Sequence, residues 1–126
     1  MESREELTVQ FVHYSKYGRK FSKAIETVLS GSVKKHIFSP SGRVVFTVVG
    51  RDSEEFIDPE RPFCSCNNFF FKVLSGEAEL CYHLLSYKIA FESKNLDTIN
   101  FSDDEYAPLL SAVSRDVLEN LKEQRR

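Results

Sequence analysis

The sequence lacks several features that would assign a chain to a class at once. It contains no tryptophan and only three cysteines, and no apolar run approaches the roughly 20 residues of a bilayer-spanning helix. Its first residues, MESREELTVQ, have neither the basic start nor the apolar stretch of a secretory signal. We therefore expect an intracellular protein, in which an odd number of cysteines does not form a disulfide framework.

The composition that remains is typical of a folded globular domain. Apolar residues make up 41% of the 126 residues and charged residues 29%, which is too apolar for a disordered chain. The length fits one domain over 1–126, and the eleven phenylalanines predict a core built largely of Phe packing. Within it we expect a helical segment over 1–32, a β-hairpin with a metal-binding segment over 33–95, and a C-terminal helix over 102–126.

Charge is distributed unevenly along the chain. The formal net charge of −2 argues against nucleic-acid binding by bulk electrostatics. The stretch 16–43 is nevertheless strongly basic, whereas acidic runs follow at 54–60 and 103–105. Such blocks are also typical of a surface that is merely solvated. A nucleic-acid surface in the basic stretch would be built from Lys20, Lys34, Lys35 and Arg43.

The first half of the chain predicts two helices and a hairpin. Residues 5–16 have a mixed apolar pattern compatible with a helix ending near Gly18, and residues 21–29 have the spacing of an amphipathic helix. Two β-branched runs, 33–38 and 44–49, flank a break with turn residues, which indicates an antiparallel hairpin. Residues 54–58 would add a third strand.

The second half predicts further helices, over 67–74, over 80–91 and at the C-terminus. Ser102 and Glu105 form a capping-box pattern, but Pro108 would then fall past the first turn, so we predict that the last helix begins at Pro108. The expected fold class is α+β, with N-terminal helices, a small antiparallel hairpin or three-stranded sheet, and a C-terminal helix.

All three cysteines lie in one short constellation. Cys64 and Cys66 form one close pair, Cys81 and His83 form another, and fourteen residues separate the pairs. Zinc prefers a tetrahedron of thiolate sulfur and imidazole nitrogen, and four such ligands leave no position open for a substrate. The pattern therefore predicts one structural zinc ion held by Cys64, Cys66, Cys81 and His83.

Other chemistry for these residues fits less well. A redox pair usually has two intervening residues, not the one between Cys64 and Cys66. A nucleophile and base at Cys81 and His83 would be two residues apart on a helix, where side chains do not face one another. The sequence also has no phosphate-cradling glycine loop and no nucleophile motif. We therefore expect no enzyme, with redox, catalytic or plain core thiols as weaker alternatives.

The segments CSC and CYH, with their spacer and a β-rich lead-in, resemble the SWIM zinc finger, whose pattern is CxC followed by CxH. The similarity extends over about 37–120, where the chain resembles the small SWIM-domain subunit of Shu-type complexes. This resemblance implies a ββα-type finger and a role in homologous recombination and DNA repair through binding a RecA-family recombinase paralog. It also implies a nuclear location in a eukaryote or a cytoplasmic one in an archaeon.

Partner binding is the function we expect first. Apolar residues at 69–71, in the N-terminal helices and at Leu110, Val113, Val117 and Leu121 would form the docking face, unless they are ordinary core. The alternative is direct binding of single-stranded DNA by the basic stretch 16–43, with aromatic side chains for base stacking. An enzyme, such as a zinc hydrolase, is the weakest expectation because the metal shell would be full.

Overall fold

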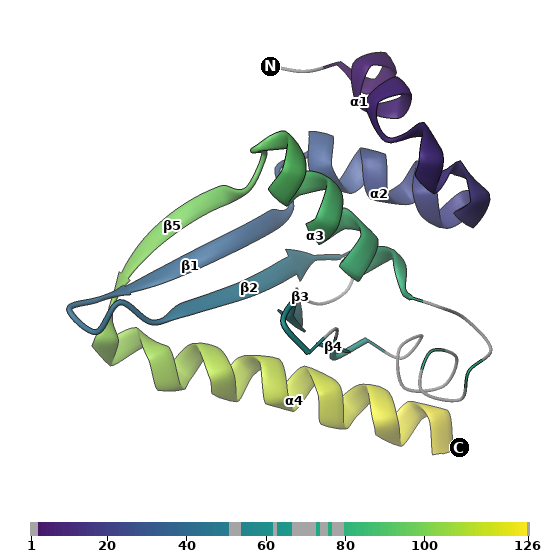
Figure 1. The fold of residues 1–126 in the computed structure, drawn as a ribbon. Helices are drawn as coiled ribbons and strands as arrows, with labels where there is room; N and C mark the ends of the chain where they lie inside the picture. Colours follow the sequence, from purple (N-terminus) through teal and green to yellow (C-terminus); the bar gives the residue numbers. More distant parts are fainter. Residues whose placement is uncertain are drawn as a thin grey trace.

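The computed structural model describes residues 3–50, 54–61, 63–66, 73, 76 and 80–125, with only the backbone at 113, 116, 117 and 119–125. The described elements form an α+β fold, which confirms the predicted class (Figure 1). In chain order they are α1 (Arg4–Gln10), η1 (Val12–Tyr17), α2 (Arg19–Leu29), β1 (Val33–Ser39), β2 (Val44–Val49), β3 (Glu54–Asp58), β4 (Phe63–Cys64), α3 (Tyr82–Ser93), β5 (Asp97–Ser102), η3 (Asp103–Glu105) and α4 (Tyr106–Arg125).

The strands form one sheet in the order β4-β3-β2-β1-β5. The predicted hairpin is β1 and β2, and the predicted third strand is β3; both pairings are antiparallel. The sheet is larger than the expected three strands because β4 extends one edge and β5 pairs in parallel with β1 at the other. β4 has only two residues, too few to be recognised as a strand, and Asp, Asn and Ser in β5 disfavour strand structure. The sequence prediction therefore missed both strands.

Helices cover both faces of the sheet (Figure 1). On one face α3 contacts the strands β1 to β4, and α2 packs along α3; on the other face α4 runs past β3. The apolar stripe of α2, formed by Phe21, Ala24, Ile25 and Val28, is buried as its spacing predicts. The N-terminal segment therefore packs on the helix that follows the cysteine-containing region.

The boundaries of the N-terminal helix and of α3 differ from the sequence prediction. The helix expected over 5–16 ends at Gln10 and continues as the 3₁₀ helix η1 up to Gly18, whose φ is +60°. The helix expected from residue 80 begins two residues later, at Tyr82. Apart from residue 73, the helix expected over 67–74 lies outside the described residues.

The predicted start of the last helix at Pro108 is wrong. Ser102 and Glu105 do form a capping box, which closes the 3₁₀ turn η3, and α4 then begins at Tyr106. Pro108 is therefore in the first turn of α4, where its missing N–H is one of those without an intrahelical partner. Of the predicted apolar stripe Leu110 is half-buried; the side chains of Val113, Val117 and Leu121 lie outside the described part. Among the described residues, no helix has the length and apolar character needed to cross a membrane.

Candidate metal centre

The structure brings together the four residues that the sequence singles out as metal ligands. Cys64 is the last residue of β4, and Cys66 lies two residues after it. Cys81 is the N-cap of α3, and His83 is in the first turn of that helix. Their ligand atoms all lie within 4.8 Å of one another, and all four residues are buried. Two segments separated by fourteen residues therefore meet at one point, between the edge of the sheet and the start of α3.

Ser65, between the first two cysteines, fastens that segment to β3. Its backbone N–H donates to the carbonyl of Phe56 at 3.0 Å, and its hydroxyl accepts from the Phe56 N–H at 2.9 Å. The same hydroxyl donates to Oε2 of Glu55 at 2.7 Å. Ser65 is 2% exposed and Glu55 is 4% exposed, so these bonds are made out of reach of water. The orientation of Cys64 and Cys66 thus depends on a buried serine–glutamate contact.

Nothing in the sequence singles out Glu55 for this position. It lies in the short strand β3, nine residues before Cys64, and its carboxylate would ordinarily be solvated. The alternation of β3 is the one available signal, because it places the side chains of Glu55 and Ile57 on the same, buried face. A carboxylate at a buried strand position needs a donor, and the Ser65 hydroxyl supplies one.

Cys81 and His83 converge because they belong to different backbone conformations. Cys81 is extended, with φ −90° and ψ 167°, and its carbonyl accepts from the Leu85 N–H at 3.2 Å as the first turn begins. The premise that both residues lie on the helix, used above against a catalytic pair, is therefore wrong. A catalytic pair is instead disfavoured because Cys64 and Cys66 lie in the same cluster as Cys81 and His83, as expected for a metal site.

The three thiols influence one another's ionisation. Hydrogen bonds from Cys64 and Cys66 lower the pKa of Cys81, and the first turn of α3 adds a backbone hydrogen bond from Leu84. Contacts with Cys66 and Cys81 raise the pKa of Cys64, because a second thiolate beside the first is repelled. The protein alone thus favours a thiolate at Cys81 over one at Cys64, and a divalent cation would stabilise both thiolates together.

A buried nitrogen of His83 is a second observation that fits a metal ion at this cluster. Nδ1 of His83 is buried and has no hydrogen-bond partner among the described residues. A buried imidazole nitrogen without a partner is costly, and coordination would satisfy it. Sulfur and imidazole ligands favour zinc and other soft or borderline ions over calcium or magnesium. The site could hold one metal ion in a shell of four protein ligands.

Helix α2 places two lysines against this centre. Nζ of Lys20 donates to the carbonyl of Leu80 at 3.0 Å, and Nζ of Lys23 lies 4.3 Å from the centre of the Tyr82 ring. Burial, followed by the Cys66 thiol and Glu55, raises the pKa of Tyr82. Three thiolates and an imidazole around a divalent cation carry excess negative charge, so two cations within one turn of α2 are electrostatically favourable here.

The four residues predicted for nucleic-acid binding do not form one surface. Lys20 is engaged with Leu80, and Lys34 forms an ion pair with Asp97 at 2.6 Å. Lys35 follows Lys34 on β1, so its side chain points to the opposite face of the sheet. Arg43, in the hairpin, lies 4.6 Å from the centre of the Tyr106 ring.

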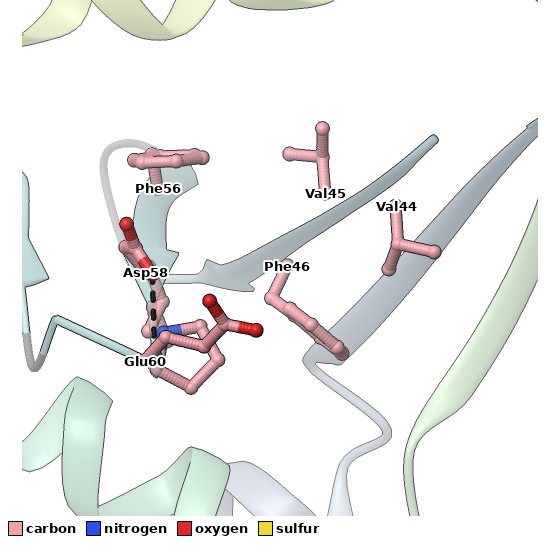
Figure 2. A pocket seen from close by; sticks show the side chains of 8 residues that line it. Val44, Val45, Phe46, Phe56, Asp58 and Glu60 are labelled. Carbon is pink, nitrogen blue, oxygen red and sulfur yellow. Dashed lines mark hydrogen bonds between the residues drawn. The ribbon is translucent and has the colours of Figure 1, made fainter. Parts of the chain in front are cut away.

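A separate hollow of about 280 Å³ lies where β2 and β3 diverge (Figure 2). Figure 2 shows Val45 and Phe56 turned to one side of the sheet and Phe46 and Glu60 to the other. Besides apolar side chains its lining includes two carboxylates, and that of Asp58 accepts the Glu60 N–H. None of the four candidate ligands lines this hollow, so it is distinct from the metal centre.

A buried Cys₃His set joining a strand to the start of a helix defines a metal-binding finger of the zinc-finger class. Comparison with curated proteins identifies which finger this is. The chain is 30% identical over 96 residues to human zinc finger SWIM domain-containing protein 7, covering 75% of this chain and 68% of the human protein. It therefore belongs to the family of zinc finger SWIM domain-containing protein 7, as its CxC and CxH segments indicate.

A second relative supports the same assignment. The chain is 28% identical over 92 residues to the zinc finger SWIM domain-containing protein 7 homolog of Dictyostelium discoideum. That match covers 71% of this chain and 59% of the relative, so the chain spans about three fifths of that protein's length. No protein-family model matches the chain, and no solved structure matches it either.

Proposed function

We propose that the chain binds one structural zinc ion through Cys64, Cys66, Cys81 and His83. The observation that carries this proposal is the convergence of the four buried ligand atoms within 4.8 Å. Zinc in such a shell supplies a fixed tetrahedral link and has no open position for water or substrate. The link would join β4 to α3 and so hold the start of α3 against the sheet.

The surrounding residues prepare the site for this ion. Ser65 and Glu55 orient the first two cysteines, and the first turn of α3 favours a thiolate at Cys81. Lys20 and Lys23 offset the negative charge that collects there. Each of these groups acts on ligand position or charge, which is the behaviour expected around a structural metal.

We further propose that the protein is a non-catalytic accessory protein of homologous recombination and DNA repair. Its partner would be a RecA-family recombinase paralog, and any ATPase activity of the complex would belong to that partner. Family membership and the resemblance to the small subunit of Shu-type complexes support this role, together with a metal shell that leaves no reactive position. The protein would act in the nucleus of a eukaryote or the cytoplasm of an archaeon.

Co-expression with a recombinase paralog from the same organism tests the role. The wild-type chain and the exposed-surface control Ser111→Ala should copurify with the paralog and contain zinc. Cys64→Ser should lose the zinc and the partner together, because one missing ligand unlocks the finger. A zinc-loaded, folded wild-type chain that copurifies with no paralog would remove the recombination role and leave the metal site standing.

Binding of single-stranded DNA through Lys20, Lys34, Lys35 and Arg43 ranks below partner binding. Three of these residues already have partners within the chain, and the four are spread over α2, β1 and the hairpin turn. Titrating labelled single-stranded DNA at two salt concentrations tests it, since contacts with phosphate weaken steeply as salt rises. No binding at the lower salt concentration would eliminate this function for the isolated chain.

A further inference from the structure

Strand β5 is the outer strand of the sheet, and its far edge faces away from the other strands (Figure 1). It is six residues long, and among the described strands it pairs only with β1. Four of its residues are exposed, and Ile99 and Phe101 are half-buried. A strand of this length at an edge presents backbone N–H and C=O groups that can pair with another chain.

The register identifies which backbone groups point outward. The Phe38 N–H donates to the Arg43 carbonyl across the hairpin, so Phe38 faces β2 and, by alternation, Ile37 faces β5. Ile37 lies opposite Asn100. In a parallel ladder a residue bonds to the two neighbours of the residue opposite it, here Ile99 and Phe101. The backbone groups of Asn100, and two residues earlier those of Thr98, therefore point to the open edge.

Three common devices that block strand pairing are absent from β5. The sequence of β5, DTINFS, has no proline and no lysine, and its pairing with β1 runs without a bulge. Ile99 and Phe101 share a face with His36, against which the Phe101 ring stacks at 5.4 Å. An added strand would continue this face and cover the exposed parts of both side chains.

Charge decides which kind of strand fits. Asp97 begins β5, and Asp103, Asp104 and Glu105 follow it, with no lysine or arginine between residues 95 and 114. Lys34 pairs with Asp97, and Ser41 donates to Asp103, whereas Asp104 is exposed. Lys34 and Lys35 of β1 lie beside the start of β5, so the acidic end of this edge is the one at 103–105. That end disfavours nucleic acid and attracts a basic group on an added strand.

We propose that the outer edge of β5 binds an extended, basic segment of a partner protein by strand addition. Apolar side chains at alternate positions of the segment pack beside Ile99 and Phe101, and a lysine or arginine at one end lies near Asp104. Main-chain hydrogen bonds to Thr98 and Asn100 provide the affinity. The inference rests on the proposed partner-binding role and names a surface and a partner chemistry for it.

A synthetic peptide tests the edge directly on the full zinc-loaded chain. The probe alternates valine with threonine over six positions and ends in two lysines. Binding should slow amide hydrogen exchange at Thr98 and Asn100 and should weaken about tenfold or more when alternate peptide nitrogens are methylated, because those donors are lost. A peptide with glutamates in place of the lysines should bind less tightly. Unchanged exchange at millimolar probe, or equal binding of the methylated peptide, would overturn the proposal.

Two variants separate the edge from the fold. Asn100→Pro removes an outward N–H and keeps the pairing with β1, and Asn100→Lys places a positive charge beside the acidic run. Both should keep zinc and the helical circular dichroism of the wild type and lose about tenfold or more in probe affinity. If both folded variants bind the probe as tightly as the wild type does, the probe does not bind at the β5 edge and the proposal fails.

The recombinase paralog and light scattering complete the test. If Asn100→Pro still copurifies with the paralog while no probe binds, the edge proposal fails and the partner role stands. If the probe binds as expected and no paralog copurifies, the partner role fails. If light scattering finds a dimer of the wild-type chain and a monomer for Asn100→Pro, the edge pairs with a second copy of the chain. That result would overturn the proposal of a basic partner segment.

Discussion

Two regions of this molecule differ in what stabilises them. The hairpin half comprises α2, β1 and β2, and the finger comprises 63–66 and 80–83 with the start of α3. In the hairpin half, α2 and the strands β1 and β2 bury Ile25, Val28, Val33 and Val48, all at most 3% exposed. The finger contributes Cys64, Cys66 and Cys81 to the same apolar cluster, where they lie with large side chains such as Leu80, Leu84 and Leu85. Apolar burial is common to both regions, and the finger adds four candidate metal ligands that converge from two segments of the chain.

The candidate metal site is part of the core and not an addition to its surface. Cys64 and Cys81 are completely buried and lie in the cluster with Leu84 and Leu85. A thiol at such a position packs like a small apolar side chain, but its neighbours raise the pKa of the Cys64 thiol, and a cation would offset this effect. Changes in the finger should therefore depend on metal, and changes in the hairpin half should not.

The largest expected effect is that of removing the metal. Structural zinc contributes about 10–16 kcal/mol to the folding of small zinc-finger peptides. Chelation, or Cys81→Ser, should abolish amide protection at 63–66 and 80–83, while the amides of α2, β1 and β2 remain protected for longer. Hydrogen exchange read residue by residue checks this, with zinc added back as the control. Equal loss of protection in both regions would erase the distinction between them.

A core substitution should have a smaller effect and no metal dependence. Ile25→Ala deletes a side chain that is 1% exposed and should lower the free energy of unfolding by about 2–5 kcal/mol. Val9→Ala, at a residue 74% exposed, is the matched control and should change it by less than about 0.5 kcal/mol. Denaturant titration gives both values. A fall in zinc content for Ile25→Ala would show that the two regions are not independent.

Loss of the serine between the first two cysteines should affect the finger and its zinc affinity specifically. Ser65→Ala leaves the buried Glu55 carboxylate without that donor and should cost about 1–3 kcal/mol, with a lower zinc affinity in chelator competition. Ser86→Ala is the control, because Ser86 is equally buried and donates to the Tyr82 carbonyl inside α3. Its loss should leave zinc affinity unchanged. An equal fall in zinc affinity for the two variants would argue against a specific role for Ser65.

The smallest effect is expected from pH and belongs to the hairpin side. Hydrogen bonds from His36 and Thr47 lower the pKa of Glu54 in the folded state. The unfolded value is about 4.3. The stability from this group is therefore complete above that value and is lost as the pH falls through the lowered folded pKa. Glu54→Gln should flatten this part of the stability curve, measured by denaturant titration between neutral and acidic pH; an unchanged slope would contradict it.

Local patterns were sufficient to predict the hairpin half from the sequence. The spacing of Phe21, Ala24, Ile25 and Val28 predicts α2, and the β-branched runs around the 39–43 break predict β1 and β2. The four candidate metal ligands could be singled out because ligand chemistry limits the residue types, although the fourteen-residue spacer has no pattern of its own. Their convergence in space is what the structure adds.

The remaining features depend on tertiary contacts that the sequence does not encode locally. β5 is a strand because β1 offers it an edge and because Phe101 packs on His36 and Phe38. The contact of Ser65 with Glu55 joins residues ten positions apart through the β3–β4 pairing. The basic residues of 16–43 look like one patch in sequence, but the alternation of β1 and the partners of Lys20 and Arg43 disperse them.

Elemental analysis of the purified chain tests the central claim most directly, that three cysteines and one histidine hold a zinc ion as part of the core. Measured together with the fold by circular dichroism, it should find one zinc per chain in the wild type and none in Cys64→Ser, which should also lose the structure of the finger. A wild-type chain that is fully folded with no bound metal, or a Cys64→Ser chain that keeps both its zinc and its fold, would contradict it.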